Sequence, residues 1–90
     1  MEELTEEVVV VNPLGIHARP AAALVQRILP FESEVYLNFN GNRVNAKSIM
    51  GLLTLAATQG ARLSVWCKGS DASAAMEAVK ELFASGFGES

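Results

Sequence analysis

Residues 8–20, which read VVVVNPLGIHARP, decide the fold because they hold the end of a strand, a turn and the start of a helix. The four valines are β-branched and favour a strand, and Asn12-Pro13 is a turn signal that ends it. Apolar residues then recur at the three-and-four spacing of one helical face. These residues are Ala18, Ala21, Ala22, Val25, Ile28 and Leu29. We therefore predict a strand over residues 8–11, then a helix that Pro30 ends.

The only histidine of the chain, His17, falls at or beside the N-cap of this helix. The backbone N–H groups of Ala18 and Arg19 in the first turn have no intrahelical acceptor, and the helix dipole adds positive potential there. Pro20 suits a first turn, where its missing N–H has no helical partner. Arg19 supplies a permanent cation with a forked set of donors suited to phosphate. This pattern indicates a nucleophilic His17 beside an anion cradle, and the alternative is a histidine that only caps the helix.

The rest of the chain predicts three more strands and two more helices. Residues 34–39 alternate, with Val35, Leu37 and Phe39 on one face, and residues 40–42 (Asn-Gly-Asn) reverse the chain into a short strand over residues 43–45. Ser48 can cap a short helix that runs to about Leu53, and Gly60 provides the break before a strand over residues 61–67. Residues 69–71 give a turn and an N-cap for a last helix. The buried stripe of that helix is Ala75, Met76, Val79, Leu82 and Phe83, and Gly86 and Gly88 end it.

Composition narrows the class of protein. Ninety residues, half of them hydrophobic, predict one globular domain over residues 1–90. The net charge of −3 argues against nucleic-acid binding, and the apolar runs are too short for membrane insertion. The acidic start of the chain is unlike a signal peptide, so we expect a cytoplasmic protein. A single histidine and a single cysteine, Cys67, predict neither an internal disulfide nor a metal site, and we expect no cofactor.

Two segments resemble the HPr family, the histidine-containing phosphocarriers of the bacterial phosphotransferase system. Residues 12–22 (NPLGIHARPAA) are similar to the active-site segment of that family, and residues 45–52 (NAKSIMGL) are similar to its regulatory-serine segment. The resemblance covers nearly the whole chain. It implies an α+β open-faced β-sandwich with the order βαββαβα, in which a four-stranded antiparallel sheet carries three helices on one face.

The resemblance also implies a function and the residues that perform it. His17 would accept a phosphoryl group from phospho-enzyme I on Nδ1 and pass it to IIA domains, while Arg19 and the backbone N–H of Ala18 stabilise the phosphate. Ser48 would be the regulatory serine, which a dedicated HPr kinase/phosphorylase modifies in many members. An ordinary helix N-cap is enough to explain the same serine, so its regulatory use stays open.

A docking surface follows from the same mapping. Leu14, Ile49, Met50 and Leu53 would form an apolar patch beside His17, with Arg19, Arg27 and Lys47 at its rim. Such a surface suits weak and fast exchange with acidic partners, whose approach is steered by charge. The alternative places most of these apolar residues in the core.

Three functions remain open on the sequence. The first is a carrier for sugar uptake, and the second is a nitrogen-type regulatory member of the same family. The third is a non-catalytic interaction module in which His17 is merely a cap. We expect a monomer, because the chain is a small acidic carrier.

Overall fold

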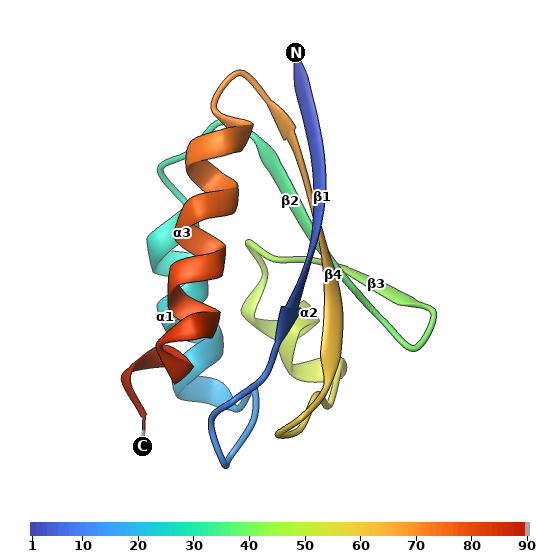
Figure 1. Cartoon of the computed structure of the whole chain (residues 1–90), viewed down its shortest axis with the longest axis vertical. Coiled ribbons are helices and arrows are strands. Elements are labelled where there is room, and N and C mark those ends of the chain that lie inside the picture. The colour runs from blue at the N-terminus through green and yellow to red at the C-terminus, as the bar shows by residue number, and fades with distance from the viewer. Residues whose placement is uncertain (90) are drawn as a thin grey trace.

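The computed structural model describes residues 1–89. The chain forms eight elements in the order that the sequence predicts, with one short 3₁₀ turn added at the end (Figure 1). They are β1 (Glu2–Val9), α1 (Ala18–Ile28), β2 (Glu34–Phe39), β3 (Asn42–Asn45), α2 (Ile49–Thr54), β4 (Arg62–Gly69), α3 (Ala72–Ala84) and η1 (Gly86–Gly88). The predicted order βαββαβα is confirmed.

The four strands form one antiparallel sheet in the order β1-β4-β2-β3. β1 pairs with β4 from Glu2 opposite Gly69 to Val9 opposite Arg62, so the first and last strands are neighbours. β2 and β3 are joined by a tight hairpin, in which Asn40 and Gly41 have φ values of 51° and 80°. Positive φ at both positions is the conformation that such two-residue turns need, and it explains the Asn-Gly pair.

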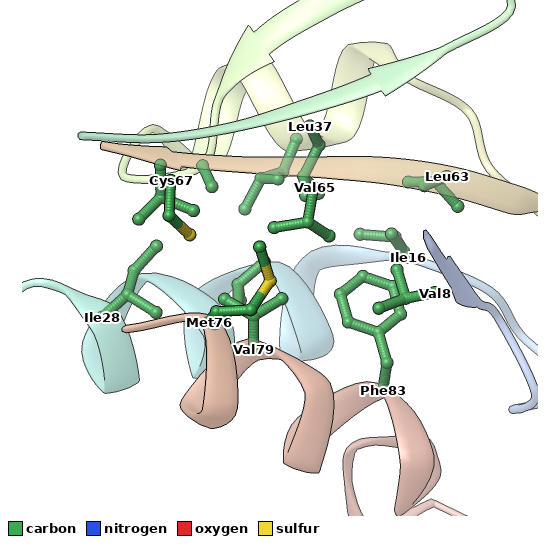
Figure 2. Close-up of a cluster of buried hydrophobic side chains, with 14 of the residues drawn as sticks. Val8, Ile16, Ile28, Leu37, Leu63, Val65, Cys67, Met76, Val79 and Phe83 are labelled. Atoms are coloured by element: carbon green, nitrogen blue, oxygen red, sulfur yellow. The ribbon is translucent and has the colours of Figure 1, made fainter. Parts of the chain in front are cut away.

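Helices cover one face of this sheet, with α1 and α3 side by side along it (Figure 1). Side chains from both layers meet in a single core (Figure 2). The sheet contributes Val35, Leu37, Leu63, Val65 and Cys67, and the helices contribute Ala21, Leu24, Ile28, Met76, Val79 and Phe83. Burial in this core raises the pKa of the Cys67 thiol to about 11, and the nearby charge of Glu6 adds to the effect. The predicted fold class is thus confirmed.

The first strand is longer at its start than its valines predict. β1 begins at Glu2, six residues before the valine run, and it ends at Val9. Pairing with β4 supplies backbone hydrogen bonds to this segment whatever its side chains are, so acidic residues are accommodated. Glu6 contacts Lys80 at 2.8 Å and Glu7 contacts Arg62 at 3.1 Å. A strand confined to residues 8–11 was therefore wrong.

The buried stripe of α1 also differs from the predicted one. Pro20, Ala21, Leu24 and Ile28 are buried, whereas Leu29 lies beyond the end of the helix with 58% of its surface exposed. The helix stops at Ile28, two residues before Pro30. Leu29 still has helical backbone and donates its N–H to the carbonyl of Val25, but Pro30 has no N–H with which to continue the helix. The buried stripe therefore includes Leu24, which the predicted stripe left out, and excludes Leu29.

The turn before α3 uses its aspartate differently from the prediction. Asp71 occupies the N-cap of α3, but its side chain makes no bond to that helix. The carboxylate instead accepts hydrogen bonds from the hydroxyl and backbone N–H of Ser33 and from the backbone N–H of Glu32. The Ser33 hydroxyl and the backbone of Glu32 hold the pKa of Asp71 below its usual value. Asp71 therefore joins the β4–α3 turn to the loop before β2.

Candidate functional site

His17 is the N-cap residue of α1, as predicted, and its side chain is free of that helix. Its backbone is extended, with φ −91° and ψ −168°, and its side chain makes no capping bond. Its backbone carbonyl accepts a hydrogen bond from Ala21 N–H at 3.0 Å, which closes the first turn. About a third (35%) of the His17 side chain is exposed. The imidazole is thus accessible at the end of a helix where N–H groups lack intrahelical partners.

The loop that carries His17 is held by a close backbone contact. Ile16 N–H donates to the carbonyl of Ala57 at 3.0 Å, and Gly15 has a φ of 70°. A Cβ atom on Gly15 would lie 2.4 Å from the oxygen of Ala57 and 3.0 Å from the Cα of Thr58. Only glycine fits both this φ and this close approach. Gly15 therefore fixes the loop against the segment before β4.

Asn12 anchors the other end of the loop. Its side chain is buried, and Nδ2 donates to the carbonyl of Gly15 at 2.8 Å and to Oε1 of Glu89 at 3.0 Å. One buried amide therefore joins the loop before α1 to the end of the chain. The sequence pattern predicted only a turn at Asn12, because a turn propensity does not reveal a contact 77 residues away.

Glu89 is a residue of this site that the sequence pattern did not predict. Its Oε2 lies 2.8 Å and its Oε1 3.1 Å from Nε2 of His17, and Oε2 lies 4.0 Å from Nε of Arg19. Burial pushes the pKa of Glu89 upward, but hydrogen bonds from Asn12 and His17, together with nearby positive charge, outweigh it and hold the pKa below its usual value. Glycines that end a helix were the only signal read in this segment, and none of them indicates a return to His17.

The cations of the predicted rim have different surroundings. The Arg19 side chain is 81% exposed. Its only acidic contact among residues 1–89 is with Oε2 of Glu89, which lies 4.0 Å from Nε. Arg27 pairs with Glu81 of α3 at 3.1 Å, and Lys47 Nζ donates to the backbone oxygen of Phe31 at 2.6 Å. Arg19 is therefore the cation beside His17, whereas the other two are tied to neighbouring elements.

The predicted apolar patch lies at the surface. Leu14 and Met50 are each 73% exposed, and Ile49 and Leu53 are also exposed, whereas Leu52 of the same helix is buried. α2 packs against α1, and Leu14 lines a hollow of about 290 Å³ together with Arg19 and Glu89. α2 is thus amphipathic, with one leucine in the core and three apolar side chains toward solvent. The alternative that placed most of these residues in the core was wrong.

Ser48 caps α2. Its hydroxyl oxygen accepts a hydrogen bond from the backbone N–H of Gly51 at 3.1 Å, and Ile49 and Met50 follow it directly. The side chain is partly exposed. The serine therefore has a structural role in its unmodified form, at the margin of the exposed apolar residues.

Two kinds of feature are absent from the described part of the chain. No three side chains of histidine, cysteine, aspartate or glutamate are grouped as metal ligands among residues 1–89. None of the helices in that range is both long and apolar enough to cross a membrane.

Comparison with known proteins assigns the family. The family model described as "PTS HPr component phosphorylation site" matches residues 4–85. The phosphocarrier protein HPr of Xylella fastidiosa (strain 9a5c) is 48% identical over 86 residues, which cover 96% of this chain and 97% of that protein. A crystal structure of HPr from Thermoanaerobacter tengcongensis superposes with a TM-score of 0.89 at 39% identity, covering 100% of this chain and 99% of the other. One from Bacillus anthracis gives 0.87 at 36% identity, covering 92% and 99%. A histidine at the start of α1, an HPr fold and this degree of identity together show that the chain belongs to the HPr family, the phosphocarrier proteins of the phosphotransferase system.

Proposed function

We propose that His17 accepts a phosphoryl group from phospho-enzyme I on Nδ1 and passes it to IIA domains. The observation that carries this proposal is an accessible imidazole at the N-terminus of α1, which makes no capping bond of its own and has Arg19 two residues away. When His17 accepts the group, the Nδ1 lone pair forms a bond to phosphorus, while the bond to the donor breaks and its electron pair stays with the donor. When the group is passed on, a nucleophile of the acceptor bonds to phosphorus, the Nδ1–phosphorus bond breaks and its electron pair returns to Nδ1. The protein thus acts as a carrier and not as an enzyme with turnover.

Arg19 and the backbone N–H of Ala18 are proposed to stabilise the phosphate. A charge at a helix N-terminus gains about 0.3 to 1 kcal/mol, and a charge-assisted hydrogen bond contributes roughly 1.5 to 3 kcal/mol. A relay needs moderate values, because each additional ~1.4 kcal/mol of phosphate stabilisation shifts the equilibrium with the next acceptor about tenfold. The 81% exposed Arg19 supports this role, because its guanidinium can turn toward a phosphate at little cost.

We further propose that partners dock on Leu14, Ile49, Met50 and Leu53. Exposure of these four side chains supports this surface, because large apolar residues gathered at a surface mark protein contacts. Arg19 supplies the charge next to His17, and Arg27 and Lys47 act at the rim. The ion pair between Arg27 and Glu81 is exposed. Arg27 can therefore leave Glu81 and pair with an acidic residue of a docking partner at little cost in free energy.

Ser48 is proposed as a regulatory phosphorylation site for an HPr kinase/phosphorylase. A phosphate on its hydroxyl adds about −2 of charge directly beside Ile49 and Met50. Docking of partners that approach with apolar or acidic surfaces is then weakened, while α2 itself keeps an oxygen acceptor at its N-cap. Residues 1–90 are proposed to act as a single monomeric domain in the cytoplasm.

Intact-mass spectrometry after incubation with phosphoenolpyruvate and a bacterial enzyme I tests the function. The wild type is expected to gain one phosphate that is lost in acid, and Ser48→Ala should gain the same phosphate. His17→Ala should gain none. Absence of phosphate from the wild type with several enzyme I proteins would instead favour the non-catalytic interaction module.

A further inference from the structure

The contact between Glu89 and His17 specifies which ring nitrogen is available for chemistry. Both carboxylate oxygens of Glu89 face Nε2, at 2.8 and 3.1 Å. An ionised carboxylate can only accept hydrogen bonds, so the hydrogen in this contact belongs to the imidazole. A neutral imidazole carries a single N–H. With that hydrogen on Nε2, the lone pair lies on Nδ1.

Several contacts hold Glu89 in this place. Its side chain is only 11% exposed, and it accepts a second hydrogen bond from the buried amide of Asn12 at 3.0 Å. Its backbone N–H donates to the carbonyl of Gly86 at 2.9 Å. Burial, the bond from Asn12 and the backbone bond to Gly86 together constrain this residue more than an incidental surface pair is constrained. The carboxylate is therefore fixed relative to the loop that carries His17.

The backbone of residues 86–88 turns the chain back toward the site. Gly86, Phe87 and Gly88 have φ values of 62°, 57° and 75°. A phenylalanine at positive φ is strained, and its ring packs edge-to-face on Phe83 at 4.9 Å between centroids. Core packing at Phe83 thus stabilises the turn that delivers Glu89.

We propose that Glu89 is a positioning residue, which holds the His17 ring with its hydrogen on Nε2 and its Nδ1 lone pair directed to the incoming phosphoryl group. This inference deepens the proposed function and rests on it for the transfer step. The carboxylate takes no proton in that step: the Nδ1–phosphorus bond forms as the bond to the donor breaks, the ring gains positive charge, and the Nε2–H bond to Glu89 then joins two charged groups. Glu89 therefore also favours the charge that the ring acquires.

Nitrogen-15 NMR of the isolated, unphosphorylated protein tests the first half of this proposal. In the wild type we expect one tautomer with its hydrogen on Nε2, and an Nε2–H resonance protected from exchange with water. In Glu89→Ala that protection should be lost. Glu89→Gln keeps an oxygen acceptor and should restore part of it, whereas Glu77→Ala, which removes an exposed carboxylate of α3, should match the wild type.

Transfer kinetics from phospho-enzyme I test the second half. Glu89→Ala is expected to lower kcat roughly threefold to tenfold, the effect of one hydrogen bond, with Glu89→Gln between it and the wild type. Thermal unfolding of each variant identifies any loss of fold. A wild-type ring with its hydrogen on Nδ1, or an unchanged Nε2–H signal in Glu89→Ala, would overturn the positioning role. A confirmed Nε2–H contact in a protein that accepts no phosphate would instead reject the proposed function and leave the contact standing.

Discussion

Met50→Ala provides the sharpest test of the proposed docking surface. The side chain of Met50 is 73% exposed, so its removal should change the free energy of unfolding by less than about 0.5 kcal/mol. Full burial of a methionine stabilises by about 1.5 to 3 kcal/mol. Covering the exposed part in a complex then contributes about 1.5 kcal/mol, which corresponds to a roughly tenfold change in affinity.

The assay is the rate of phosphoryl transfer from phospho-enzyme I at varied concentrations of the carrier. We expect KM to rise about tenfold in Met50→Ala with kcat nearly unchanged, because the side chain binds the partner and touches no reacting atom. Leu29→Ala is the matched control, since Leu29 is 58% exposed but lies after the end of α1 and outside the proposed surface. Its KM should equal that of the wild type.

Two results would refute this reasoning. If KM is unchanged in Met50→Ala, partners do not bury this side chain, and the exposed residues of α2 have another use. If Leu29→Ala raises KM as much, the effect reflects exposed apolar surface in general and not a defined patch. Equal urea denaturation midpoints for both variants and the wild type are needed to assign either result to docking.

Three further predictions concern the loop, the pH dependence and the core. Gly15→Ala places a Cβ at 2.4 Å from the oxygen of Ala57 at a φ of 70°. We therefore expect the free energy of unfolding, measured by urea denaturation, to fall by about 2 kcal/mol or more, and phosphorylation of His17 to be slower. Wild-type values of both would show that the loop moves to accommodate the methyl group. Asp71 has a lowered pKa in the folded protein, so its contribution to stability is complete above the unfolded pKa of about 4 and is lost as the pH falls through the folded value. The difference in stability between the wild type and Asp71→Asn should shrink correspondingly in melts at decreasing pH, and a constant difference would contradict the bonds to Ser33. Cys67, buried and with a pKa of about 11, should react with a thiol reagent at pH ~8 only when the protein unfolds, and fast labelling of the folded protein would contradict its burial.

Local sequence patterns predicted the elements that depend on neighbouring residues. The Asn-Gly turn between β2 and β3, the short helix capped by Ser48 and the alternating β4 all have the predicted type and nearly the predicted bounds. Turn conformation, capping and period are properties of a few consecutive residues, so they can be read before folding. His17 was placed at the start of α1 for the same reason, and the family resemblance supplied the chemistry that this position alone did not prove.

The sequence by itself thus determined the order of elements, the N-terminal position of His17 on its helix and the family. Tertiary structure decided the strand order, the start of β1 at Glu2, the split of α2 into one buried and three exposed apolar residues, and the contact of Glu89 with His17. His17 and Glu89 are 72 residues apart, and no periodicity or turn signal spans that distance. Their contact exists because β1 pairs with β4 and α3 packs on that sheet, so that the chain after α3 ends beside the loop after β1. Packing of distant segments, which local propensity does not encode, therefore completed the site.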